Sequence, residues 1–228
     1  MRISAIGLTV LLAVGLLASQ APAQLGGMDL VQALELGLVD AEFRGNGGQS
    51  VIGEIWGTPG GPRTLTIAPG TQFWAQLGGI GGNQRGGIGG NNRGGGVQGM
   101  GALGGGTINL GQNLQARVEI ATACTNIGMR EPGRRDVMVA TRCPDDRVAK
   151  VAALATGPDV SHPVYQLAVW AIANDPPREM VDKYVTKLVK AELKQRPEAG
   201  VTSEMVYDLA ADVIRQAGID PTGFQLFE

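Results

Sequence analysis

The sequence predicts an α+β protein, in which an antiparallel β-sandwich-like domain with a long Gly-rich loop precedes a small four-helix domain. Between residues 38 and 142, short stretches of alternating apolar and polar side chains are separated by Gly- and Pro-containing turns, a pattern typical of antiparallel sheets with one buried face. From residue 145 onward, apolar side chains recur every three or four residues, which is the period of a helix. We therefore expect a β domain at residues 24–143 and a helical domain at residues 144–228.

The β domain opens with a short helix over residues 29–36, which Gly37 ends. Residues 114–122 give the clearest strand signal, because Gln115, Arg117 and Glu119 alternate with small or apolar side chains. The other expected strands are residues 38–43, 49–56, 64–67, 71–77 and 136–142. Short strands with tight turns of this kind favour a sandwich.

The helical domain is expected to contain helices at residues 145–155 and 161–174, a third that begins after Pro176 and Pro177, and a fourth at residues 204–217. Ser161 suits the N-cap of the second helix and Pro163 its first turn. This helix is the most apolar of the four. We expect its Trp170 to lie in the core against apolar side chains of the same and the following helix, namely Val164, Leu167, Val185 and Leu188.

Residues 78–106 form the clearest change in composition. GGIGGNQR at residues 78–85 is followed by GGIGGNNR at residues 86–93, and more glycines continue to residue 106. Such a segment buries too little apolar surface to offset the entropy of ordering glycine. We therefore expect a disordered loop within the β domain, whose deletion from Gly79 to Gly105 leaves the fold intact.

The first 23 residues have the pattern of a secretory signal peptide. Arg2 supplies a positive charge, residues 5–18 are almost continuously apolar, and Ala21-Pro22-Ala23 offers a cleavage site after Ala23. No later segment has the length of apolar sequence that a membrane span needs. We expect an exported protein, either secreted or in the periplasm or cell envelope, with no membrane span after signal removal.

Charge and residue types argue against several classes of function. The formal net charge of −2 offers no basic surface for nucleic acid. His162 is the only histidine, so a zinc site is not expected, and its neighbours Ser161 and Asp159 are too close in sequence to form a catalytic triad. The match to GxGxxG at residues 99–104 lies inside the Gly-rich segment and does not indicate a dinucleotide site. We expect no metal, no cofactor and no catalytic residues.

Cys124 and Cys143 are the only cysteines. An even pair in an exported protein is most simply a disulfide. Because Cys124 ends one expected strand and Cys143 follows the next, a hairpin between those strands would place the two residues opposite each other. We therefore expect a Cys124–Cys143 disulfide, in which case Gln166 has no special chemistry.

A second interpretation comes from the sequence Tyr165-Gln166-Leu167-Ala168-Val169-Trp170. It resembles the Gln-x-Ala-hydrophobic-Trp motif of bacterial surface thioester domains. In that family a helical Gln condenses with an upstream Cys, and the thioester captures a nucleophile on a host surface. The resemblance implies a thioester between Cys124 and Gln166, which competes with the disulfide for Cys124.

More diffusely, the order of parts resembles secreted bacterial proteins to which no activity is assigned. Three functions follow from these observations. The first is a non-enzymatic secreted or envelope-associated protein that binds an extracellular or envelope partner or has a structural role. The second is a covalent surface adhesin that uses Cys124 and Gln166. The third is a secreted hydrolase whose site is assembled from scattered Asp, Glu and Ser residues.

Overall fold

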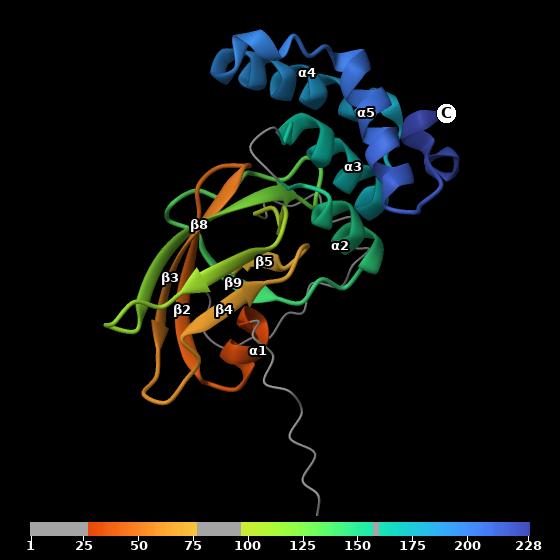
Figure 1. Cartoon of the computed structure of the whole chain (residues 1–228). Coiled ribbons are helices and arrows are strands. Elements are labelled where there is room, and N and C mark those ends of the chain that lie inside the picture. Colours follow the sequence, from red (N-terminus) through yellow and green to blue (C-terminus); the bar gives the residue numbers. More distant parts are fainter. Residues whose placement is uncertain (1–26, 77–96, 157–159) are drawn as a thin grey trace, which may run out of the picture.

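The computed structural model describes residues 27–76, 97–156 and 160–228. A β-barrel forms one part of the molecule, and helices lie over one end of it (Figure 1). The expected signal peptide at residues 1–23 lies outside the described residues and stays a prediction. Along the described part of the chain, no helix combines the length and the hydropathy that a membrane crossing requires.

The barrel is closed, and its strands follow the order β2-β3-β8-β6-β5-β9, with β9 pairing again with β2. All of its pairings are antiparallel. The barrel strands are β2 (Val39–Gly45), β3 (Ser50–Gly57), β5 (Gln72–Ala75), β6 (Met100–Ala102), β8 (Gln115–Cys124) and β9 (Val137–Thr141). Inside the barrel, the rings of Phe43 and Phe73 pack with their centroids 5.1 Å apart.

The expected sandwich is therefore wrong. Strand β9 pairs with β2 through Phe43 and Met138, and with β5 on its other side, so it joins strands that a sandwich would leave as open edges. A barrel and a sandwich both bury one face of each strand, so the alternation of side chains is the same for both. The pairing partners, which this alternation does not specify, decide between them.

A smaller sheet lies beside the barrel and has the order β1-β4-β7, with β1 (Met28–Asp29) parallel to β4 (Thr64–Ile67) and β7 (Gly106–Asn109) antiparallel to it. Helix α1 (Leu30–Glu35) follows β1 directly. Its N-cap is Asp29, whose carboxylate accepts a hydrogen bond from the backbone N–H of Gln32 at 2.9 Å.

The expectation of a disordered loop at residues 78–106 is wrong for the C-terminal part of that segment. Residues 78–96 lie outside the described residues, but Val97 bridges to Arg130 and Met100–Ala102 form strand β6. Met100 and Ala102 are fully buried, because β6 joins β5 to β8 and completes the barrel. Two apolar side chains between glycines are enough for such a short strand when both neighbouring strands are already in place.

The remaining helices are α2 (Asp146–Ala153), α3 (His162–Asn174), α4 (Arg178–Gln195) and α5 (Ser203–Gln216), with short 3-10 turns at Pro197–Ala199, Pro221–Gly223 and Gln225–Phe227. The expectation of a separate four-helix domain after the sheet is also wrong. Helix α3 packs against α2, α4 and α5 and also against strand β8, and one hydrophobic cluster runs through barrel and helices. The contact between α3 and β8 positions the candidate site.

Candidate functional site

The two cysteines are not bonded to each other, so the expected disulfide is wrong. The expectation assumed that their strands form a hairpin, but β8 pairs with β3 and β6, whereas β9 pairs with β2 and β5. The Cys124 sulfur lies 3.6 Å from the Met100 sulfur, inside the core. The Cys143 thiol is half-buried and donates a hydrogen bond to the carbonyl of Asp145, the N-cap of α2, at 3.1 Å.

The structure instead brings Cys124 next to Gln166, which is 42 residues away in sequence. The backbone N–H of Cys124 donates to Gln166 Oε1 at 2.8 Å, and Gln166 Nε2 donates to the Cys124 carbonyl at 2.7 Å. Both residues are almost completely buried, with 4% of Cys124 and 1% of Gln166 exposed. The side-chain amide therefore pairs with the main chain of Cys124 as a neighbouring strand would.

The end of strand β8 explains this pairing. Backbone groups of Thr122 and Cys124 point toward the side on which β3 lies. There, the N–H of Thr122 donates a hydrogen bond to the Gln49 carbonyl. The β3 ladder starts at Ser50, opposite Ala121, so Cys124 extends beyond the reach of β3. A buried backbone N–H and C=O must find partners. Gln166, in an otherwise apolar part of α3, supplies both.

The thiol of Cys124 is held in a neutral state. It donates to the Gly48 carbonyl at 3.6 Å, and a Cβ placed on Gly48 would lie 3.5 Å from the sulfur and 3.1 Å from the carboxyl carbon of Glu131. Gly48 thus separates the thiol from the Glu131 carboxylate. Burial, with a further contribution from the negative charge of Glu131, raises the pKa of Cys124 to about 12. At neutral pH the sulfur keeps its proton.

His162 lies on the same face of α3 as Gln166, one helical turn earlier. Its Nε2 is 3.1 Å from the carbonyl of Thr122, two residues before Cys124. Nδ1 is fully enclosed and has no hydrogen-bond partner among the described residues. Burial lowers the pKa of His162, opposed by the carbonyls of Thr122 and Gly48 and by the charge of Glu192.

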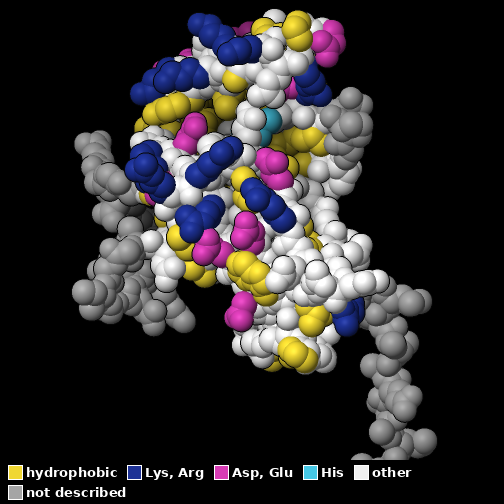
Figure 2. All heavy atoms as spheres, turned by 90° about the vertical axis from the view of Figure 1, so that its left-hand side faces the viewer, with side chains coloured by type: hydrophobic (Ala, Val, Ile, Leu, Met, Phe, Trp, Pro, Cys, Tyr) yellow, Lys and Arg dark blue, Asp and Glu magenta, His cyan; other side chains and the backbone are white. Residues whose placement is uncertain are grey.

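These contacts give His162 a defined tautomer. A neutral ring that donates from Nε2 to a carbonyl has its lone pair on Nδ1. The side chain is half-buried, and the cyan of the chain's single histidine is visible on the face drawn in Figure 2. The same view shows basic and acidic side chains interspersed over the face, without a large surface of one sign.

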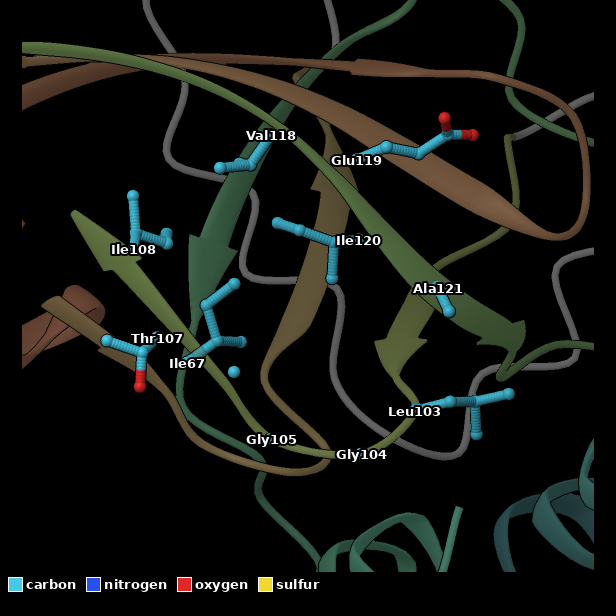
Figure 3. A pocket seen from close by; sticks show the side chains of 11 residues that line it. Ile67, Leu103, Gly104, Gly105, Thr107, Ile108, Val118, Glu119, Ile120 and Ala121 are labelled. Carbon is cyan, nitrogen blue, oxygen red and sulfur yellow. The ribbon is translucent and has the colours of Figure 1, made fainter. Parts of the chain in front are cut away.

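Two cavities of the described residues lie elsewhere. A cavity of about 170 Å³ lies between β4, β7 and β8, and Figure 3 shows Ile67, Val118 and Ile120 around one space while Glu119 points away from it. A second hollow of about 310 Å³ includes Cys143 in its wall. Neither is lined by Cys124, Gln166 or His162. Because Cys124 and Gln166 are almost completely buried, the pair is a closed site at the junction of α3 and β8.

Two other carboxylates of the described residues, Asp136 and Asp145, are held in ion pairs. No group of three or more His, Cys, Asp or Glu side chains in these residues is arranged to hold a metal ion. The pKa of Asp136 is lowered to about 2 by its hydrogen bonds with Arg130, and that of Asp145 is lowered by Arg147. Both are ion pairs with exposed arginines that hold loop or helix-cap geometry.

The sequence named Cys124 and Gln166 as a candidate pair and gave no role to His162, and the structure brings all three to one junction. It missed Gly48, Met100 and Glu131. Gly48 belongs to a turn cluster, Met100 to the Gly-rich segment and Glu131 to a loop before β9, and no periodicity connects them. Comparison with protein-family models, with curated proteins and with solved structures finds no match for this chain.

Proposed function

We propose that this chain is an extracellular or envelope protein that binds its partner covalently, through a thioester between Cys124 Sγ and Gln166 Cδ. The observation that carries the proposal is the clamp of the Gln166 carboxamide on the main chain of Cys124 by two hydrogen bonds. Because Cys124 is not bonded to Cys143, its sulfur is available for this bond. The proposal keeps the expected role in binding a partner and makes that binding covalent.

Thioester formation is an intramolecular exchange that needs no oxidant. The Cys124 sulfur adds to Gln166 Cδ, the C–N bond breaks, and the nitrogen leaves as ammonia with the thiol proton. Because Gln166 Oε1 accepts the backbone N–H of Cys124 at 2.8 Å, that N–H is placed to stabilise negative charge on the oxygen during addition. Holding the carboxamide beside the residue that bears the thiol also removes much of the entropic cost of bringing them together.

Capture reverses the exchange with a different nitrogen. A primary amine of the partner attacks Cδ, the C–S bond breaks, and the partner is left joined to Gln166 by an amide while Cys124 regains its thiol. Burial of both residues keeps water from the thioester until a partner engages the junction. The resemblance of residues 165–170 to the motif of surface thioester domains supports the same chemistry from the sequence.

Intact mass measurement tests the proposal. The wild-type protein is expected to lack the mass of one ammonia molecule, and methylamine is expected to add to it with recovery of one free thiol. Peptide mapping should place the link between Cys124 and Gln166. Cys124→Ala and Gln166→Ala should each show their full mass and take up no methylamine.

Cys143→Ser is the matched control, because it removes the other thiol without touching the junction, and it should behave as wild type. A folded wild-type protein with its full mass, two free thiols and no uptake of methylamine would overturn the thioester. So would a Cys124–Cys143 linked peptide.

A further inference from the structure

His162 contacts the same stretch of main chain as the Cys124–Gln166 pair. Its Nε2 lies against the Thr122 carbonyl, and the carbonyl of Gly48, which accepts from the Cys124 thiol, is also a neighbour of the ring. Gln166 follows one turn later on α3. The Thr122 carbonyl therefore holds the imidazole beside the junction, the Gly48 carbonyl lies near the ring, and Nδ1 has no hydrogen-bond partner among the described residues.

The chemistry of the pair requires a group that moves protons. The raised pKa of Cys124 makes its thiolate costly to form and, for the same reason, a poor leaving group in this environment. During formation a proton must pass from sulfur to the departing nitrogen. During capture a proton must pass from the incoming nitrogen to sulfur. A neutral imidazole can accept the proton in the first half of each step and return it in the second.

Two groups near Cys124 could carry this proton. Glu131 faces it across Gly48 but lies on the exposed side of the loop, whereas His162 has an enclosed, unpartnered nitrogen in the described part of the chain. The other charged side chain that faces the ring is Glu192 of α4, which forms an ion pair with Arg196. Glu192 is thus partnered, and it lies on the helical side of the ring.

We propose that His162 carries the proton between the Cys124 sulfur and the nitrogen that leaves or enters at Gln166 Cδ. In formation, Nδ1 takes the Sγ–H proton and gives it to the nitrogen of Gln166 as the Cδ–N bond breaks. In capture, Nδ1 takes a proton from the attacking amine and gives it to Sγ as the C–S bond breaks. The ring is neutral at the end of each step. This inference rests on the proposed thioester.

The rate of methylamine capture by loaded protein tests the inference. His162→Gln can still donate to the Thr122 carbonyl but cannot exchange a proton, so we expect it to slow capture about 100-fold. His162→Ala should be equally slow and should recover with added imidazole. Tyr165→Phe, whose hydroxyl bonds the Leu154 carbonyl away from the junction, is the matched control and should react at the wild-type rate.

The outcomes separate the inference from the proposed function. A wild-type protein that never loses ammonia overturns both. Loaded His162→Gln that captures methylamine at the wild-type rate overturns the role of His162 alone, as does a loss of rate in Glu131→Gln without one in His162→Gln. A His162 variant that does not load supports the inference if imidazole restores loading, and contradicts it if the folded variant stays unloaded.

The pH dependence of methylamine capture by the wild-type protein gives a test that needs no variant. The rate, corrected for the fraction of methylamine that is unprotonated, should fall only below the ordinary histidine pKa of 6.5, because burial lowers the pKa of His162 and keeps the ring neutral above it. Once the ring is protonated, it can no longer accept the proton of the amine. A corrected rate that stays constant as the pH is lowered well below 6.5 would overturn the inference.

Discussion

At the scale of single residues, the proposed function depends on the buried Gln166 carboxamide, which pairs with the main chain of the buried Cys124. The sequence motif at residues 165–170 indicated Gln166, and the structure places it on Cys124. The disulfide was predicted from an even cysteine count and from adjacent strands in sequence. Neither observation contains the order of strands in the sheet, so the separation of Cys124 from Cys143 could not be predicted from them.

Gln166 should also stabilise the fold through its two hydrogen bonds to Cys124. We expect Gln166→Ala to lower the free energy of unfolding by about 3 kcal/mol, because a buried N–H and a buried C=O lose their partners. The comparison is made in the Cys124→Ala background, where no thioester can contribute. Denaturant unfolding is the measurement. Gln216→Ala, at an exposed position of α5, should change stability little, and an equal effect of the two changes would contradict the prediction.

The two thiols should differ in reactivity when the thioester cannot form. In Gln166→Met, which keeps a side chain of similar length, native alkylation at mildly alkaline pH should modify Cys143 and spare Cys124. Cys124 is 4% exposed with a pKa raised to about 12, so little thiolate exists below that pH. Cys143 is half-buried. In denaturant both should react alike; equal labelling in the native protein would show that the junction is open.

At the scale of elements, helix α3 uses one face to contact both strand β8 of the barrel and helix α4. His162, Gln166 and Trp170 are spaced four residues apart, and they contact Thr122, the main chain of Cys124 and the ring of Tyr184 in turn. The helical period of the sequence predicted this helix. It could not predict which face meets the barrel, because nearly all of α3 is apolar and buried.

Trp170 is buried, as the sequence predicted, with 4% of its surface exposed. Its ring meets that of Tyr184 in an edge arrangement with centroids 5.9 Å apart. Trp170→Ala should lower stability by about 3 to 5 kcal/mol, as expected when a large core side chain is removed, and Trp170→Phe by less. Thermal or denaturant unfolding measures it. Trp56→Ala, at a position 37% exposed, is the control and should cost much less.

At the scale of the whole molecule, closure of the barrel could not be predicted from the sequence. The strands with clear alternation, β3 and β8, were located well, but closure depends on β6, only 3 residues long within a Gly-rich segment. Its pairing with β5 and β8 is a non-local property. The same closure places Met100 against the sulfur of Cys124, so barrel topology and candidate site are linked.

The sequence predicted that deletion of Gly79 to Gly105 leaves the fold intact, but the structure predicts that this deletion disrupts it. It removes β6, which leaves β5 and β8 with unpaired edges and takes the fully buried Met100 and Ala102 out of the core. We expect this variant to fail to fold or to unfold at a much lower denaturant concentration, because both backbone pairing and apolar burial are lost.

A shorter deletion of residues 79–94 leaves every described strand in the chain and serves as the matched comparison. Unfolding midpoints and the loss of ammonia from intact mass should both be measured, since Met100 lies against the Cys124 sulfur. Equal midpoints for the two deletions would mean that β6 contributes nothing to the closed barrel.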